Sequence, residues 1–203
     1  MSESKIFLLS PANAAGKRAA MLFRKEADFD LAQRLRTEGA TIGEVFSFVS
    51  GLYFRGKLAY SQRFGVARRI GSASLVITAG RGLVPTDTRI TLTDLEEFGR
   101  SPIDHRDPRY SAPLAADATE LRRASGEDAQ VVLLGSIATS KYVDLLLETF
   151  GERLCFPAAF VGMGDMQRGA AMLRAAGSGE ELPYVTALNA VRSRAVGRGS
   201  KRR

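Results

Sequence analysis

Short apolar runs that each end at a polar or glycine-containing turn alternate with helical segments along most of this chain. The runs that predict core strands span residues 5–10, 75–79, 131–134 and 153–156. Apolar runs of this kind, closed by turn residues, are typical of buried strands, and helices between them are typical of crossover connections. The pattern therefore predicts an α/β fold with a mostly parallel central sheet and helices on both faces, in a Rossmann-like arrangement.

The segments between these strands carry helical spacing of apolar residues. The predicted helices span residues 14–22, 28–38, 41–50, 51–64, 140–150 and 166–176. Asn13 is a good N-cap, so the first helix should begin immediately after the first strand. Residues 99–113, rich in Pro, Asp and Arg, predict a long connection, and Tyr184 and Val185 predict an edge strand.

Composition limits the class of protein. The chain has 203 residues and 45% hydrophobic content, enough for one buried core, so we expect a single α/β domain over residues 1–191. No window approaches the ~18 apolar residues of a membrane helix, and the first residues run straight into a strand, which predicts a cytoplasmic protein. With Cys155 and His105 as single representatives of their types, neither a disulfide nor a tightly bound transition metal such as zinc is expected.

The net charge of +7 is concentrated at the end of the chain. The segment after Glu181 contains no acid and six cations, so it accounts for six of the seven net positive charges. The rest of the chain therefore carries a net charge close to +1. The cations of this end are Arg192, Arg194, Arg198, Lys201, Arg202 and Arg203. Residues 192–203 are thus expected to be a basic flexible tail, which either attracts polyanions non-specifically or only keeps the chain soluble.

The loops at the carboxyl ends of the predicted strands are rich in polar residues and glycine. They comprise residues 10–18, Gly80–Arg81–Gly82, Gly135–Ser136 and residues 162–165. In parallel sheets, ligands bind outside the carboxyl ends of the strands where the strand order reverses. Glycines there either terminate strands or let a backbone approach a ligand closely. Several such loops at one sheet edge predict a binding site.

Several common enzyme classes are disfavoured by missing motifs. The chain has no G-x-x-x-x-G-K-[ST] pattern, no G-x-G-x-x-G after a strand and no G-x-S-x-G. A P-loop enzyme, a dinucleotide enzyme and a serine hydrolase are therefore not expected. His105, the single candidate imidazole base, lies in a Pro- and Asp-rich stretch and is interpreted more readily as a solvated turn residue than as a catalytic one.

Some side chains fit a nucleic-acid chemistry, and each has a structural alternative. Asn13 can orient a water beside a helix N-terminus, or can act only as the N-cap. Tyr53 and Phe54 beside Arg55 offer an aromatic surface with a cation for a flipped base, or are core residues. Asp165 near the start of the last helix is favoured there by the helix dipole whatever its role.

The order of these motifs resembles that of the uracil-DNA glycosylase superfamily. Asn13 is placed like the asparagine or aspartate that positions water in its mismatch-specific branch. Leu52–Tyr53–Phe54, residues 78–83 and residues 160–165 are similar to a leucine-tyrosine, an "SAKYGL" and a "P-L-x-G-x-G-I-G" segment of small bacterial domains and of a domain of archaeosine synthase. The resemblance covers roughly residues 5–176 and extends to a phage-defence DNA glycosylase that removes glucosylated hydroxymethylcytosine. The first motif of uracil glycosylases and their late histidine-proline-serine motif are missing, so uracil is not the expected substrate.

This resemblance implies a DNA glycosylase that flips a modified base of phage DNA and leaves an abasic site as an antiviral defence. It implies Asn13 and Asp165 as catalytic residues, with Asn13 holding the water. The implied base-binding residues are Ser10, Tyr53, Gly162, Gly164 and Arg168. The implied DNA-binding residues are Lys17, Arg18, Arg55, Arg81, Arg198, Lys201 and Arg202. DNA is the expected partner of a monomer that does not contact a membrane, and the implied reaction needs no metal or organic cofactor.

Two other functions stay open at this stage. A nucleotide- or nucleic-acid-binding accessory protein would keep the fold without catalysis, because a fold alone does not establish chemistry. A nucleoside hydrolase or transferase would act on free nucleosides and would tolerate loss of residues 192–203.

Overall fold

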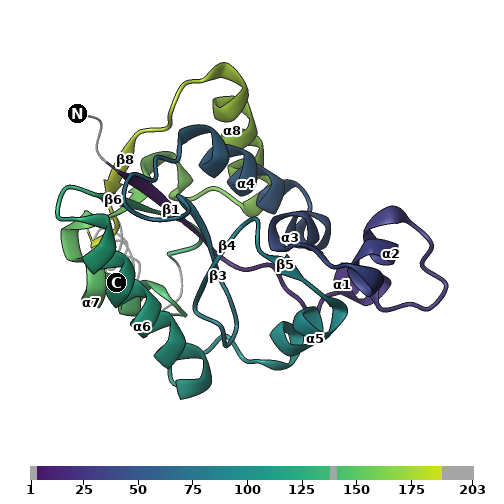
Figure 1. The fold of residues 1–203 in the computed structure, drawn as a ribbon. Coiled ribbons are helices and arrows are strands. Elements are labelled where there is room, and N and C mark those ends of the chain that lie inside the picture. The colour runs from purple at the N-terminus through teal and green to yellow at the C-terminus, as the bar shows by residue number, and fades with distance from the viewer. Residues whose placement is uncertain (1–3, 138–140, 189–203) are drawn as a thin grey trace, which may run out of the picture.

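The protein is built on a mixed six-stranded sheet. The computed structural model describes residues 4–137 and 141–188. The strands follow the order β4-β3-β1-β6-β7-β8 (Figure 1). Their bounds are β1 Lys5–Leu9, β3 Ser74–Ile77, β4 Leu83–Pro85, β6 Gln130–Leu134, β7 Leu154–Pro157 and β8 Tyr184–Thr186. The four inner strands are parallel, and β4 and β8 pair antiparallel at the two edges, so the predicted mostly parallel α/β sheet is confirmed.

Strand β1 lies in the middle of the sheet because its side chains are apolar on both faces. Residues 6–9 (Ile-Phe-Leu-Leu) have no exposed surface, as expected for a parallel strand covered on both sides. Leu9, its last residue, is in register with Val76 of β3 on one side and with Leu134 of β6 on the other. The residue that follows Leu9 is therefore held at the centre of the sheet edge.

Two groups of helices cover the two faces of the sheet (Figure 1). Helices α4 and α8 lie on one face, with α3 against α4, and α6 and α7 lie on the other. The helix bounds are α1 Lys17–Leu22, α2 Asp30–Thr37, α3 Ile42–Ser50, α4 Leu52–Phe64, α5 Leu92–Arg100, α6 Pro108–Ser125, α7 Val143–Phe150 and α8 Asp165–Ser178. Single 3-10 turns lie at η1 Gly151–Arg153 and η2 Ala158–Phe160.

Helices α4 and α8 pack with their backbones in contact because each has a glycine where they meet. A Cβ atom on Gly56 would lie 2.5 Å from the carbonyl oxygen of Gly169. A Cβ atom on Gly169 would lie 2.7 Å from the carbonyl oxygen of Leu52. Neither distance is possible for a real side chain, so only glycine permits this approach. It brings the start of α8 close to the buried face of α4.

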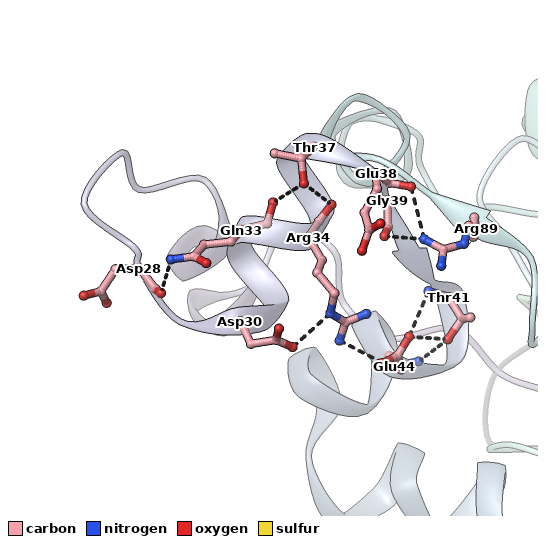
Figure 2. Close-up of polar contacts among 10 residues, drawn as sticks. All are labelled: Asp28, Asp30, Gln33, Arg34, Thr37, Glu38, Gly39, Thr41, Glu44 and Arg89. Carbon is pink, nitrogen blue, oxygen red and sulfur yellow. Dashed lines mark hydrogen bonds and ion pairs between the residues drawn. The ribbon is translucent and has the colours of Figure 1, made fainter.

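Helix α2 is fastened to α3 by a small polar network (Figure 2). Arg34 on α2 donates to Asp30 and to Glu44, each at 2.9 Å. Glu44 in turn accepts from the Thr41 backbone, while the Thr41 side chain accepts from the Glu44 backbone, so α3 begins with a capping box. The Arg34 guanidinium holds the pKa of the Glu44 carboxyl below its usual value.

A short antiparallel ribbon lies next to this network. Strands β2 Ala40–Thr41 and β5 Arg89–Ile90 form it, and Arg89 donates to the carbonyl oxygens of Glu38 and Gly39 (Figure 2). This ribbon, β4 and helix α5 were not expected from the sequence.

The sequence predictions were wrong in two places. The first helix begins at Lys17 with Gly16 as its N-cap, so Asn13 is not the cap; its side chain instead accepts from Ala15 N–H in a tight turn. Residues 99–113 are not a continuous connection, because α6 begins at Pro108. Asp107 accepts from Arg109 N–H as its N-cap, and Pro108 at the first helical position has no N–H to satisfy.

Among the residues that the structure describes, no helix combines the length and the apolar character needed to cross a membrane. The predicted basic tail, residues 192–203, lies outside the described residues.

Candidate functional site

A cavity of about 580 Å³ opens at the carboxyl ends of β1 and β6. The chain crosses from β1 to β3 on one side of the sheet and from β6 to β7 on the other, so the strand order reverses between β1 and β6. Ligands of open α/β sheets bind at such a point. Its lining comprises Ser10, Pro11, Ala12, Asn13, Ser50, Tyr53, Ile103, Ser136, Lys141, Tyr142 and Asp165.

A smaller cavity of about 220 Å³ adjoins this one. The two share Asn13 and its neighbours after β1, together with Ile103 and Lys141. Ala79, after β3, and Phe98, on α5, belong to the smaller cavity alone. A further cavity of about 600 Å³ lies elsewhere, against β4 and α6, and its charged lining residues Asp87, Asp117 and Glu120 are all acidic. That lining does not suit an anionic ligand.

Asn13 and Asp165 line the same cavity although they lie far apart in the sequence. Asn13 is exposed in the turn after β1, and Asp165 is the exposed first residue of α8. The expectation that a helix N-terminus adjoins Asn13 was wrong, because the six-residue helix α1 starts only at Lys17. The positive end of a longer helix, α8, instead lies at Asp165, on the other side of the cavity.

A buried lysine contacts the cavity wall from the interior. Lys57 on α4 is 1% exposed, and its ammonium donates to the carbonyl oxygen and the hydroxyl oxygen of Ser10 at 2.9 and 2.7 Å. It also lies 4.0 Å from the centre of the Tyr53 ring. Burial lowers the pKa of Lys57 to about 7, because a charged amine loses its hydration in the interior.

Ser10 connects this lysine to a tyrosine at the far side of the cavity wall. The Tyr142 hydroxyl is hydrogen-bonded to Ser10 and accepts from Ser136 N–H at 3.0 Å. Burial raises the pKa of Tyr142. A Cβ atom on Gly135 would lie 2.9 Å from both the Ser10 Cβ and the Tyr142 hydroxyl, so glycine is required for these groups to meet.

Tyr53 forms part of the wall rather than a free stacking surface. It is 8% exposed, and Lys57 lies over its ring. Burial raises the pKa of the Tyr53 hydroxyl to about 12, against the opposing effect of Arg168. Phe54 is completely buried and Arg55 is exposed, so the three side chains do not form one aromatic surface, and the alternative interpretation of Tyr53 and Phe54 as core residues is confirmed.

Arg168 is held by its own helix and the preceding turn. Its guanidinium donates to the carbonyl oxygen of Phe160 at 3.1 and 3.3 Å and lies 3.6 Å from the Asp165 carboxylate. Gly162, at a φ of +83°, and Gly164, the N-cap of α8, shape the turn before this helix. Neither glycine nor Arg168 is part of the lining of the larger cavity, which receives Asp165 alone from this segment.

The predicted DNA-binding residues that the structure describes lie in three settings. Arg18 and Arg55 line a hollow of about 470 Å³ with Met21, Ser47, Phe48 and Gly51, next to the α3–α4 junction that also gives Ser50 to the larger cavity. Lys17 is exposed at the start of α1. Arg81 instead pairs with Asp94 and Glu97 and lies over Phe98, so its charge is partly neutralised. Arg198, Lys201 and Arg202 lie outside the described residues.

His105 and Cys155 are not among the residues that line the two adjoining cavities. His105 is exposed in the turn before α6, 3.7 Å from Asp104. Cys155 on β7 contacts Gln130. Within residues 4–137 and 141–188, no three His, Cys, Asp or Glu side chains come together in a group able to hold a metal ion.

Lys57 and Tyr142 were not expected from the sequence. The sequence signal that could have indicated a buried Lys57 is its helical spacing from Tyr53 and Tyr60. This spacing puts Lys57 on the buried face of α4. Residues 51–57 also match the first positions of a phosphate-binding P-loop, but Leu58 follows and helix α4 runs through the segment. The match therefore does not form such a loop.

Comparisons of the chain with protein-family models, with curated proteins and with solved structures find no match.

Proposed function

We propose that this protein hydrolyses the N-glycosidic bond of a modified nucleobase in DNA, with a Rossmann-like fold of the uracil-DNA glycosylase type. The observation that supports this most directly is that Asn13 and Asp165 line one cavity at the reversal of strand order. At about 580 Å³ the cavity has the size of a small-molecule site, and it fits a flipped nucleotide.

In the proposed reaction, the bond between the base and the sugar stretches until the sugar is cationic and the base anionic. Asp165, which lines the cavity, stabilises the positive sugar, while the backbone N–H groups at the start of α8 favour the negative base. Asn13 holds the water that attacks the sugar carbon. The residues invoked are side chains and backbone of the chain itself.

The surroundings of the cavity support a nucleic-acid substrate. The hollow with Arg18 and Arg55 adjoins the cavity across the α3–α4 junction, so a strand lying over both would place phosphates near cations. The cations of residues 192–203 would add non-specific attraction to DNA. With phage DNA as the target, the resulting abasic sites would give an antiviral defence.

The test is to incubate the protein with three duplex DNAs, containing glucosylated hydroxymethylcytosine, cytosine or uracil, and with the corresponding free nucleosides. Mass spectrometry of released bases and alkaline cleavage at abasic sites report the reaction. We expect release from the glucosylated duplex, and a loss of about 10²- to 10³-fold for Asn13→Ala or Asp165→Asn.

The matched control is Asp30→Asn, which removes the first-turn acid of α2 outside the cavity and should leave the rate unchanged. Release from nucleosides alone would favour a nucleoside hydrolase. Retained DNA binding without released base would favour a binding module and would overturn the proposal.

A further inference from the structure

We propose that Lys57 and Ser10 form a proton relay behind the cavity, in which Ser10 takes the proton of the attacking water and passes its own to Lys57. The inference rests on the proposed function and names residues that carry the proton in that reaction. Ser10 lines the cavity, so it is within reach of a bound water; Lys57 does not line it and acts through Ser10.

The geometry of the pair suits proton transfer. Lys57 Nζ and Ser10 Oγ are 2.7 Å apart, and the second contact to the Ser10 carbonyl oxygen, at 2.9 Å, fixes the amine in place. Tyr142 is hydrogen-bonded to Ser10 from the β6–α7 connection, with its hydroxyl fixed by Ser136 N–H. Ser10 therefore lies between a buried amine and a buried phenol.

Charged and titratable groups surround Lys57 from each element packed against it. Tyr53 lies on its own helix, Asp165 and Arg168 come from α8, and Tyr142 approaches Ser10 from the opposite side. Burial lowers the pKa of Lys57 most, Asp165 opposes this and Arg168 adds to it, with a result of about 7. A neutral amine, able to accept a proton, is thus available near neutral pH, as in enzymes whose serine is activated by a lysine.

The step balances without a further reactant. The bond between the sugar carbon and the base nitrogen breaks, its electron pair stays on the base, and a carbon–oxygen bond forms from water. The water proton moves to Ser10 Oγ as the Ser10 hydroxyl proton moves to Lys57 Nζ. The Lys57 ammonium then returns a proton through Ser10 to the departing base, so the relay ends in its starting state.

The test measures base release from duplex DNA containing glucosylated hydroxymethylcytosine between pH 5 and 9, under single-turnover conditions. Because the neutral amine is the active form, the wild-type rate should rise tenfold per pH unit and level off near pH 7. The rate of base release by Lys57→Met should be about 10²- to 10⁴-fold lower than that of the wild type and should not rise with pH. Ser10→Ala should behave in the same way.

Lys57→Arg separates the relay from a structural role. Arginine keeps a positive donor at this position but does not lose its proton, so a structural role predicts rescue whereas the relay predicts a rate as low as that of Lys57→Met. The matched control is Ser61→Ala, which removes a buried hydroxyl on α4 that bonds only to Leu58 among the described residues and should leave the profile unchanged. Circular dichroism shows which variants are folded.

The outcomes distinguish the two proposals. Absence of base release by the wild type from every DNA would overturn the proposed function and the relay with it. A wild type that is active, with Lys57→Arg equally active or a pH profile unchanged in Lys57→Met, would overturn the relay alone. Trapping of a covalent DNA adduct at Lys57 by borohydride would also overturn it, since the amine would then attack the sugar directly.

Discussion

Lys57 couples the stability of the fold to pH. Burial lowers the pKa of its amine in the folded protein to about 7, from the usual value of 10.5. Between these values the unfolded chain holds a proton that the folded chain lacks, so raising the pH stabilises the folded state. Below pH 7 both states are protonated and the full cost of burying the charge remains.

We therefore expect the free energy of unfolding of the wild type to rise by about 3 to 5 kcal/mol relative to Lys57→Met between pH 7 and 10.5. When the free energies of unfolding of the two proteins are subtracted, the contributions of all other titrating groups cancel. Urea denaturation at a series of pH values measures it. If the free energies of unfolding of the two proteins changed in parallel with pH across this range, the amine would have its ordinary pKa in the folded state.

At the scale of elements, the contact between α4 and α8 determines how far apart the groups of the candidate site lie. Tyr53 and Lys57 lie on α4, and Asp165 begins α8, so the spacing of these two helices sets the spacing of the groups. Gly56 and Gly169 permit the contact.

Gly169→Ala should destabilise the protein by about 1 to 3 kcal/mol, because the new Cβ would lie 2.7 Å from the Leu52 carbonyl oxygen and would force the helices apart. Gly177→Ala is its matched control on the same helix, where a Cβ meets nothing within 4 Å. The control should stabilise by about 0.5 to 1 kcal/mol, since alanine is the better helix former. Two urea curves of equal midpoint would contradict this account.

The elements that could be predicted from the sequence are those whose apolar residues follow one period. Residues 131–134, all apolar, form the core of β6, and the spacing around Leu146 predicted α7. Helix α6 was missed because Pro108 and Pro113 suggest a loop. In the structure the first proline starts the helix after its Asp107 cap, and the second is tolerated inside it.

The candidate site was predictable in its location but not in its chemistry. Polar residues after predicted strands indicated the sheet edge where Asn13 and Ser10 lie. The partners of Ser10 could not be inferred, because Lys57 and Tyr142 reach it through the packing of α4 and through Gly135, which depend on the whole core. Asn13 departed from its expected capping role because Gly16, three residues later, precedes the helix.

At the scale of the whole molecule, charge is distributed unevenly. Residues 192–203 carry six of the chain's cations and no acid. If this segment contacts phosphates, its removal should reduce the slope of log binding constant against log salt on duplex DNA by about 3 to 5. Fluorescence anisotropy at several salt concentrations measures the slope. A variant with residues 192–203 in scrambled order should keep the wild-type slope. An unchanged slope after removal of residues 192–203 would show that the folded part alone binds DNA.

The position of β1 in the sheet has a consequence for how the protein is made. This strand is synthesised before both of its neighbours, β3 and β6, and Leu9 meets Leu134 only after all of the residues between them have been made. Until β3 and β6 are available, its apolar residues lack their partner strands and stay exposed to non-specific contacts in the nascent chain. Once β6 has been made it can pair with β1 and bring Gly135 to Ser10, so this wall of the candidate cavity forms together with the central pairing of the sheet.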